Sequence, residues 1–146
     1  MNTGHSFEPE MTGCSVAGCH YINNTQHPDA ALAKVVLQLE ITNGITALVS
    51  NLNNWAIVKG TNTFGAVNAN KYKQNGWEYT TPGDLRSITN AGPSATDQLK
   101  IPVEVRQARF NLYMLAYGKS LGIHNPQYSR YLLNDASNKV WTATQP

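Results

Sequence analysis

The sequence predicts a mainly α-helical protein in which residues 1–146 form a single domain. Residues 29 to 52 and residues 102 to 117 repeat apolar side chains at helical spacing, and Asn125-Pro126 marks the start of a further helix. A chain of 146 residues is long enough for one core and too short for two comfortable ones. We expect an antiparallel helix pair, a short C-terminal helix and a long irregular connection.

The first predicted helix covers residues 29 to 52. Its apolar residues follow one another at spacings of four and three, which places on one face Leu37, Ile41, Ile45, Leu48 and Leu52. Gly44 and its neighbouring threonines have low helix propensity, so we expect a bend or a break in the middle of this helix.

The second predicted helix begins at Pro102, a residue suited to the first turn, and ends at Gly118. One seam carries its apolar residues, which are Ile101, Val105, Ala108, Leu112 and Leu115. In the third helix, Asn125 supplies the cap and Pro126 the first turn. Its common side is expected to hold Tyr128, Leu132 and Ala136.

The connection between these helices has a different composition. Residues 53 to 100 are rich in Asn, Thr, Gly and Ser, and their apolar residues show neither a helical nor a strand periodicity. An irregular stretch of this length is uncommon in a compact domain unless contacts other than its own secondary structure keep it ordered. Its aromatic residues predict an ordered loop packed on an apolar body; they include Trp55, Tyr72, Trp77 and Tyr79.

Charge and hydropathy exclude several classes of function. Charged residues make up 14% of the chain and the net charge is +2, so the sequence contains no basic stripe for nucleic acid. No apolar run reaches the roughly 20 residues that cross a bilayer, and no basic and then apolar leader follows Met1. We therefore expect no transmembrane segment and, if the protein is exported, a chain that is already trimmed.

Both cysteines lie in C-S-V-A-G-C-H, residues 14 to 20. One interpretation is a disulfide between Cys14 and Cys19, and a second is a zinc site completed by His20 and His27. A third is covalent haem, in which the two sulfurs form thioethers and His20 ligates the iron. Adjacent Cys19 and His20 disfavour zinc and suit haem. The usual attachment motif has two residues between its cysteines and this chain has four; Gly18 permits the sharp turn that a bulge needs.

A low-spin haem needs a second axial ligand, usually His or Met. Met114 is expected to be core filler beside the seam of the second helix. His124 stands in S-L-G-I-H-N-P between two predicted helices, where it either projects from a rigid corner or is a solvated residue in an ordinary capping turn. Arg106, Arg109 and Lys119 could pair with the haem propionates, with Arg109 favoured, or could lie on an exposed helix face.

Two segments resemble multihaem c-type cytochromes, including the pentahaem nitrite reductase lineage. Residues 106 to 136 contain a helix leading into G-I-H-N-P and a further helix, as in the C-terminal segment of that family. The stretch G-H-S-F-E-P-E-M-T-G-C-S-V-A-G-C-H is similar to the family's H-x-F-x-P before an attachment motif. The two matches cover about 50 residues at the two ends of the chain.

The resemblance implies a set of ligands. Cys14 and Cys19 would hold one haem c, His20 would be the proximal ligand and His124 the distal ligand. His5 would face a neighbouring haem from another chain or a longer parent protein, and without such a neighbour it becomes the rival of His124. The haem would then form the core where the N-terminal segment meets the turn at His124.

Two histidine ligands fill both axial positions and leave one-electron exchange as the available chemistry. The expected function is therefore electron transfer without enzymatic activity, in the bacterial periplasm or outside the cell, with other c-type cytochromes or redox proteins as partners and an oligomer or filament as a further expectation. The alternative is a cytochrome-derived binding or assembly module in which Cys14 and Cys19 form a disulfide. A third hypothesis is a sensor or enzyme with an open haem site, which no catalytic constellation supports.

Overall fold

The protein is mainly helical in its computed structural model, which describes residues 21–22, 25–26, 30–71, 95–118 and 120–145. The helices are α2 (Ala30–Val58), α3 (Gly60–Phe64), α4 (Ala66–Lys71), α5 (Ala95–Lys100), α6 (Val103–Tyr117) and α7 (Pro126–Thr144). Two strands of two residues each, β1 (Tyr21–Ile22) and β2 (Thr25–Gln26), pair in antiparallel register. The predicted helical class is confirmed.

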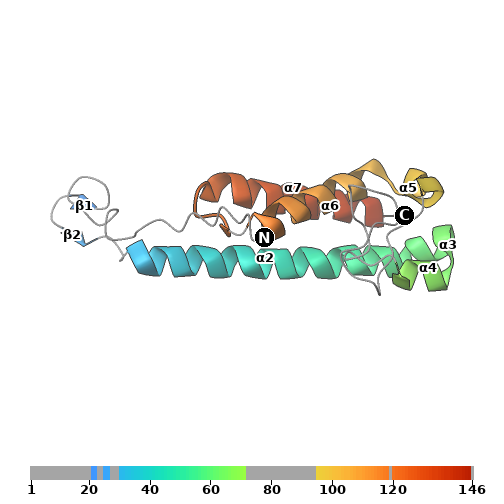
Figure 1. The fold of residues 1–146 in the computed structure, drawn as a ribbon, viewed down its shortest axis with the longest axis horizontal. Helices are drawn as coiled ribbons and strands as arrows, with labels where there is room; N and C mark the ends of the chain where they lie inside the picture. Colours follow the sequence, from blue (N-terminus) through green and yellow to red (C-terminus); the bar gives the residue numbers. More distant parts are fainter. Residues whose placement is uncertain (1–20, 23–24, 27–29, 72–94, 119, 146) are drawn as a thin grey trace, which may run out of the picture.

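Three long helices form the body of the protein. In Figure 1, α6 runs antiparallel to α2, and α7 runs back in the direction of α2. The predicted antiparallel pair is present because α2 and α6 are in contact, but α6 packs more extensively against α7. The C-terminal helix therefore completes the core, and its 19 residues make it longer than the 15 of α6. The prediction of a short C-terminal helix is wrong.

The helix α2 continues through Gly44 for 29 residues, so the predicted break is wrong. A Cβ atom placed on Gly44 would lie 2.5 Å from Cδ1 of Leu133 on α7. The missing side chain lets α7 approach α2 closely. Packing against α7 thus compensates the low helix propensity that the sequence indicated.

Apolar side chains from these three helices form one core. The predicted face of α2 is confirmed, since Ile41, Leu48 and Leu52 are fully buried and Leu37 and Ile45 are partly buried against them. The predicted seam of the second helix is also buried throughout: Ile101, Val105, Ala108, Leu112 and Leu115. Met114, expected as core filler, is instead 47% exposed.

The buried face of α7 differs by one position from the predicted face. Leu132 and Ala136 are buried as expected, but Tyr128 is 50% exposed and Ser129 is buried in its place. Neighbouring residues of a helix point about 100° apart, so the buried side of the first turn of α7 differs from the predicted side. Ser129 is small and lies in the first turns of α7, where Gly122 of the preceding turn approaches it.

The stretch from residue 53 to 100 contains more helix than its composition predicted. Its first residues belong to α2, and α3, α4 and α5 follow within the described ranges. Trp55, near the end of α2, is buried. So are Phe64 of α3 and Ala69 of α4, which place these two short helices against the rest of the protein. Residues 72–94 lie outside the described ranges.

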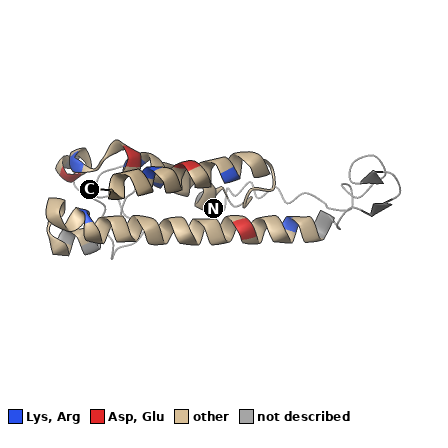
Figure 2. Cartoon of the chain, turned by 180° about the vertical axis from the view of Figure 1, so that it is seen from behind, with Lys and Arg blue, Asp and Glu red and all other residues tan. Residues whose placement is uncertain are grey.

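Few charges lie along α2, as Figure 2 shows. Within it, Leu32–Val58 is a 27-residue stretch with a mean hydropathy of 1.3, long and apolar enough to cross a membrane, and 11% of its most apolar window is buried. A core helix of a soluble protein meets the same two criteria. The burial of Ile41, Leu48 and Leu52 against α6 and α7 shows that one face of α2 is protein core.

Candidate functional site

The predicted site residues divide into two groups. Cys14, Cys19, His20 and His5 lie outside the described residues, as do His27 and Lys119. His124 and Arg109 lie within them. The structure therefore describes the C-terminal half of the predicted site, and the attachment motif stays a prediction.

His124 is exposed and lies in the turn between α6 and α7. The chain leaves α6 through a hydrogen bond from the Gly118 amide to the Met114 carbonyl (3.1 Å) and turns with the Ile123 amide bonded to the Ser120 carbonyl (3.1 Å). These bonds fix the path of the backbone immediately before His124. We call residues 118 to 125 the His124 corner.

Left-handed backbone makes this corner compact. Leu121 has φ +46° and Gly122 has φ +86°. A Cβ atom on Gly122 would lie 3.0 Å from Cγ1 of Ile41 and 3.3 Å from Ser129, so glycine satisfies both the backbone angle and the close approach to α2. The corner is thereby packed against α2 beside Ile41.

The chain after His124 enters α7 with a complete cap. Asn125 is the N-cap residue, and its side-chain oxygen accepts a hydrogen bond from the Tyr128 amide (3.0 Å). Pro126 occupies the first turn, as the sequence predicted. His124 is therefore held between a hydrogen-bonded turn and a capped helix, an arrangement that agrees with both interpretations of the sequence, the projecting corner and the capping turn with a solvated histidine.

One ion pair ties the first turns of α7 to α2. Arg130 donates from Nε to one carboxylate oxygen of Glu40 and from a terminal nitrogen to the other, both at 2.6 Å. Hydrogen bonds from the Arg130 guanidinium hold the pKa of Glu40 below its usual value. The same partner raises the pKa of Arg130. The two residues lie 90 positions apart, and nothing in the sequence indicates that they pair. From the sequence, Glu40 is an ordinary surface residue.

Arg109 is 4% exposed on α6. The interpretation of Arg109 as part of an exposed helix face is therefore wrong, because the side chain lies in the interior. Arg106, one turn earlier, is exposed. The role of Arg109 toward the propionates stays a prediction.

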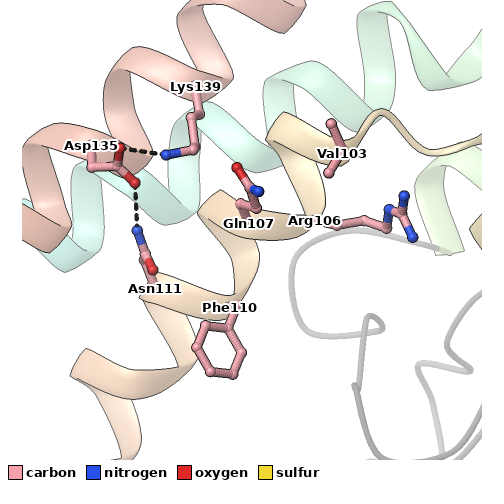
Figure 3. A pocket seen from close by; sticks show the side chains of 7 residues that line it. All are labelled: Val103, Arg106, Gln107, Phe110, Asn111, Asp135 and Lys139. Carbon is pink, nitrogen blue, oxygen red and sulfur yellow. Dashed lines mark hydrogen bonds and ion pairs between the residues drawn. The ribbon is translucent and has the colours of Figure 1, made fainter.

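A shallow groove of about 420 Å³ lies between α6 and α7 (Figure 3). Its lining residues are Val103, Arg106, Gln107, Phe110, Asn111, Asp135 and Lys139. The Asp135 carboxylate accepts a hydrogen bond from Asn111 (2.9 Å) and pairs with Lys139. The Arg106 side chain points away from these three (Figure 3).

The groove and the His124 corner are separate places. Arg106 precedes Tyr117, the last residue of α6, by eleven positions, which is about 16 Å along the helix axis. The role of Arg106 toward the propionates stays a prediction, as it does for Arg109.

Of the predicted axial ligands, His124 is the one that the structure describes. Among the described residues, no group of three or more His, Cys, Asp or Glu side chains could hold a metal ion. A haem brings four nitrogen ligands of its own and asks the protein for one imidazole on each face. The exposed imidazole of His124 would supply one of these two ligands, and the other predicted ligand, His20, lies outside the described residues.

Comparison of the chain with protein-family models, with curated proteins and with solved structures found no match.

Proposed function

We propose that this chain is an electron-transfer c-type cytochrome domain that binds one haem c covalently through Cys14 and Cys19. His20 and His124 would be the axial ligands. The observation that carries the proposal is the exposed imidazole of His124 on a corner held from both sides, in a chain whose N-terminal segment contains C-S-V-A-G-C-H. When bound, the haem supplies a reversible one-electron couple.

The protein's own part in this function is to offer imidazole nitrogens at fixed places. The hydrogen-bonded turn and the Asn125 cap keep His124 in one location, so little motion accompanies a change of charge at the site. With both axial positions taken by histidine, no position remains for substrate, which supports electron exchange and not an enzymatic reaction.

The same proposal includes roles for His5 and Arg109, the partner proteins and the cellular location. His5 either reaches a neighbouring haem or competes with His124, and Arg109 pairs with the propionates. The partners are other c-type cytochromes or redox proteins, met in the periplasm or outside the cell. Oligomers or filaments follow if the neighbouring haem belongs to a second chain.

A second candidate function is favoured by one surface of α2. Four apolar residues at helical spacing are between 56% and 59% exposed: Leu32, Val35, Val36 and Leu39. Exposed apolar surface of this kind is typical of protein contacts. A binding or assembly module with Cys14 and Cys19 as a disulfide would use such a surface and would need no haem.

Visible absorption of the purified protein separates these functions. The proposal predicts a six-coordinate low-spin spectrum, and His124→Gly should convert it to a high-spin form that binds carbon monoxide. His5→Gly is the matched control and should leave the low-spin spectrum unchanged. A protein without a Soret band would support the second candidate, and loss of the low-spin signal only in His5→Gly would give the distal position to His5.

A further inference from the structure

His124 lies between two points at which the chain contacts α2. On one side, Gly122 approaches Ile41 so closely that an added Cβ would lie 3.0 Å from its Cγ1. On the other side, Arg130 forms its two-pronged hydrogen bond with Glu40. Glu40 and Ile41 are neighbours in the sequence, so both contacts meet the same turn of α2.

The two contacts constrain the corner in different ways. The contact of Gly122 with Ile41 limits how closely the turn approaches α2, and the buried residues Ser129 and Leu133 hold α7 itself against the core. Arg130 is the fifth residue of α7, in the turns of the helix that lie nearest the corner. The ion pair therefore adds to the core contacts a second constraint on the orientation of these first turns.

The geometry of the pair suits such a role. Both guanidinium contacts to Glu40 measure 2.6 Å, and a two-pronged arginine–carboxylate pair fixes orientation as well as distance. Its side chains are 46% and 45% exposed, so the pair adds little to the stability of the fold. What the fork can supply is orientation, and the side chains of a binding site must be held within about 0.5 Å of their working places.

Resting on the proposed function, we propose that Glu40 and Arg130 are positioning residues for His124: their ion pair, with the Ile41–Gly122 contact, aims the imidazole at the haem iron. Neither residue touches the haem in this proposal. They act through the corner alone.

Carbon monoxide binding to the reduced full-length protein tests this role, because carbon monoxide enters only where an axial histidine has left the iron. Glu40→Gln keeps the size of the side chain and removes its charge. We expect the fraction of haem open to carbon monoxide to rise about fivefold in Glu40→Gln, the upper range for losing an exposed ion pair. Arg130→Lys, which keeps the charge and loses the fork, should give a smaller increase.

Two further variants distinguish an effect on the position of His124 from a general loss of protein stability. The exchange Glu40→Arg with Arg130→Glu restores an ion pair and should restore the low carbon monoxide binding. Asp97→Asn breaks the pair of Asp97 with Lys100 (3.0 Å) on α5, in which the lysine is 47% and the aspartate 15% exposed. This pair lies outside the corner, so the fraction of haem open to carbon monoxide should stay as in the wild type.

The outcomes separate this proposal from the proposed function. A wild-type protein without covalent haem overturns both. A low-spin wild type in which Glu40→Gln binds no more carbon monoxide than Asp97→Asn overturns the positioning role alone, as does an exchange variant that folds without restoring closure. If Glu40→Gln fails to fold, Arg130→Lys and the exchange variant decide between the same results.

Discussion

Gly44 of α2 and Leu133 of α7 approach each other so closely that a Cβ atom on the glycine would lie 2.5 Å from Cδ1 of the leucine. Gly44 lies in the middle of the long helix, and Leu133 belongs to the core. The contact sets how closely α7 packs against α2. Since α7 begins at the His124 corner, the same contact helps to place the candidate site.

Gly44→Ala tests this contact. The alanine gains helix propensity of about 1 kcal/mol, but overpacking a filled core typically costs about 1–3 kcal/mol. We expect the variant to be about 1 kcal/mol less stable than the wild type in denaturant unfolding. In a Leu133→Ala background the clash is absent, so the same substitution should stabilise the protein by about 1 kcal/mol. Equal effects in both backgrounds would show that the two residues do not interact.

Asn125 caps the helix that follows His124, and its loss should weaken the corner. Asn125→Ala leaves the Tyr128 amide without the side-chain acceptor that it has at 3.0 Å. The expected loss of stability is about 1 kcal/mol by chemical denaturation. Asn125→Ser retains a capping oxygen and serves as the control. A serine variant as unstable as the alanine variant would mean that capping is not the cause.

The ion pair of Glu40 with Arg130 predicts a pH dependence with a defined sign. Because the folded protein holds the pKa of Glu40 below its usual value of 4.5, unfolding raises that pKa. The stabilising contribution is therefore complete above pH 4.5 and is lost as the pH falls below it through the folded pKa. Arg130 stays charged throughout this range, since its pKa is raised.

The measurement is the melting temperature from pH 7 to pH 3 for the wild type and for Glu40→Gln. The difference between the two proteins should be largest above pH 4.5 and should vanish in acid. A difference that stays constant across the range would contradict the assignment of Glu40 as the titrating partner.

Periodicity predicted the interior of the helices well, because a buried face must recur every three or four residues. Ile41, Leu48 and Leu52 are buried as expected, and Asn125 caps α7 as its residue type indicated. Gly44 was misread because propensity describes an isolated helix and the close approach of Leu133 is a tertiary contact. Tyr128 was placed one position from the buried Ser129, since a small polar residue gives no apolar signal.

The sequence predicted only those features of the candidate site that depend on residues close together in the chain. The turn at His124 was predicted from neighbouring residues, namely Gly118 before it and Asn125 and Pro126 after it. The Glu40–Arg130 pair joins residues 90 positions apart and depends on how two helices pack. Burial of Arg109 likewise follows from tertiary packing, which the sequence of one helix does not specify.

Everything proposed for this protein depends on a haem bonded to Cys14 and Cys19. The mass of the intact, denatured chain tests this attachment, because thioether bonds survive denaturation. We expect a mass greater than that of the polypeptide by one haem, and the loss of that increment when both cysteines are replaced by alanine. A chain lighter than the reduced polypeptide by two hydrogens would show a disulfide instead and would rule out the covalent haem.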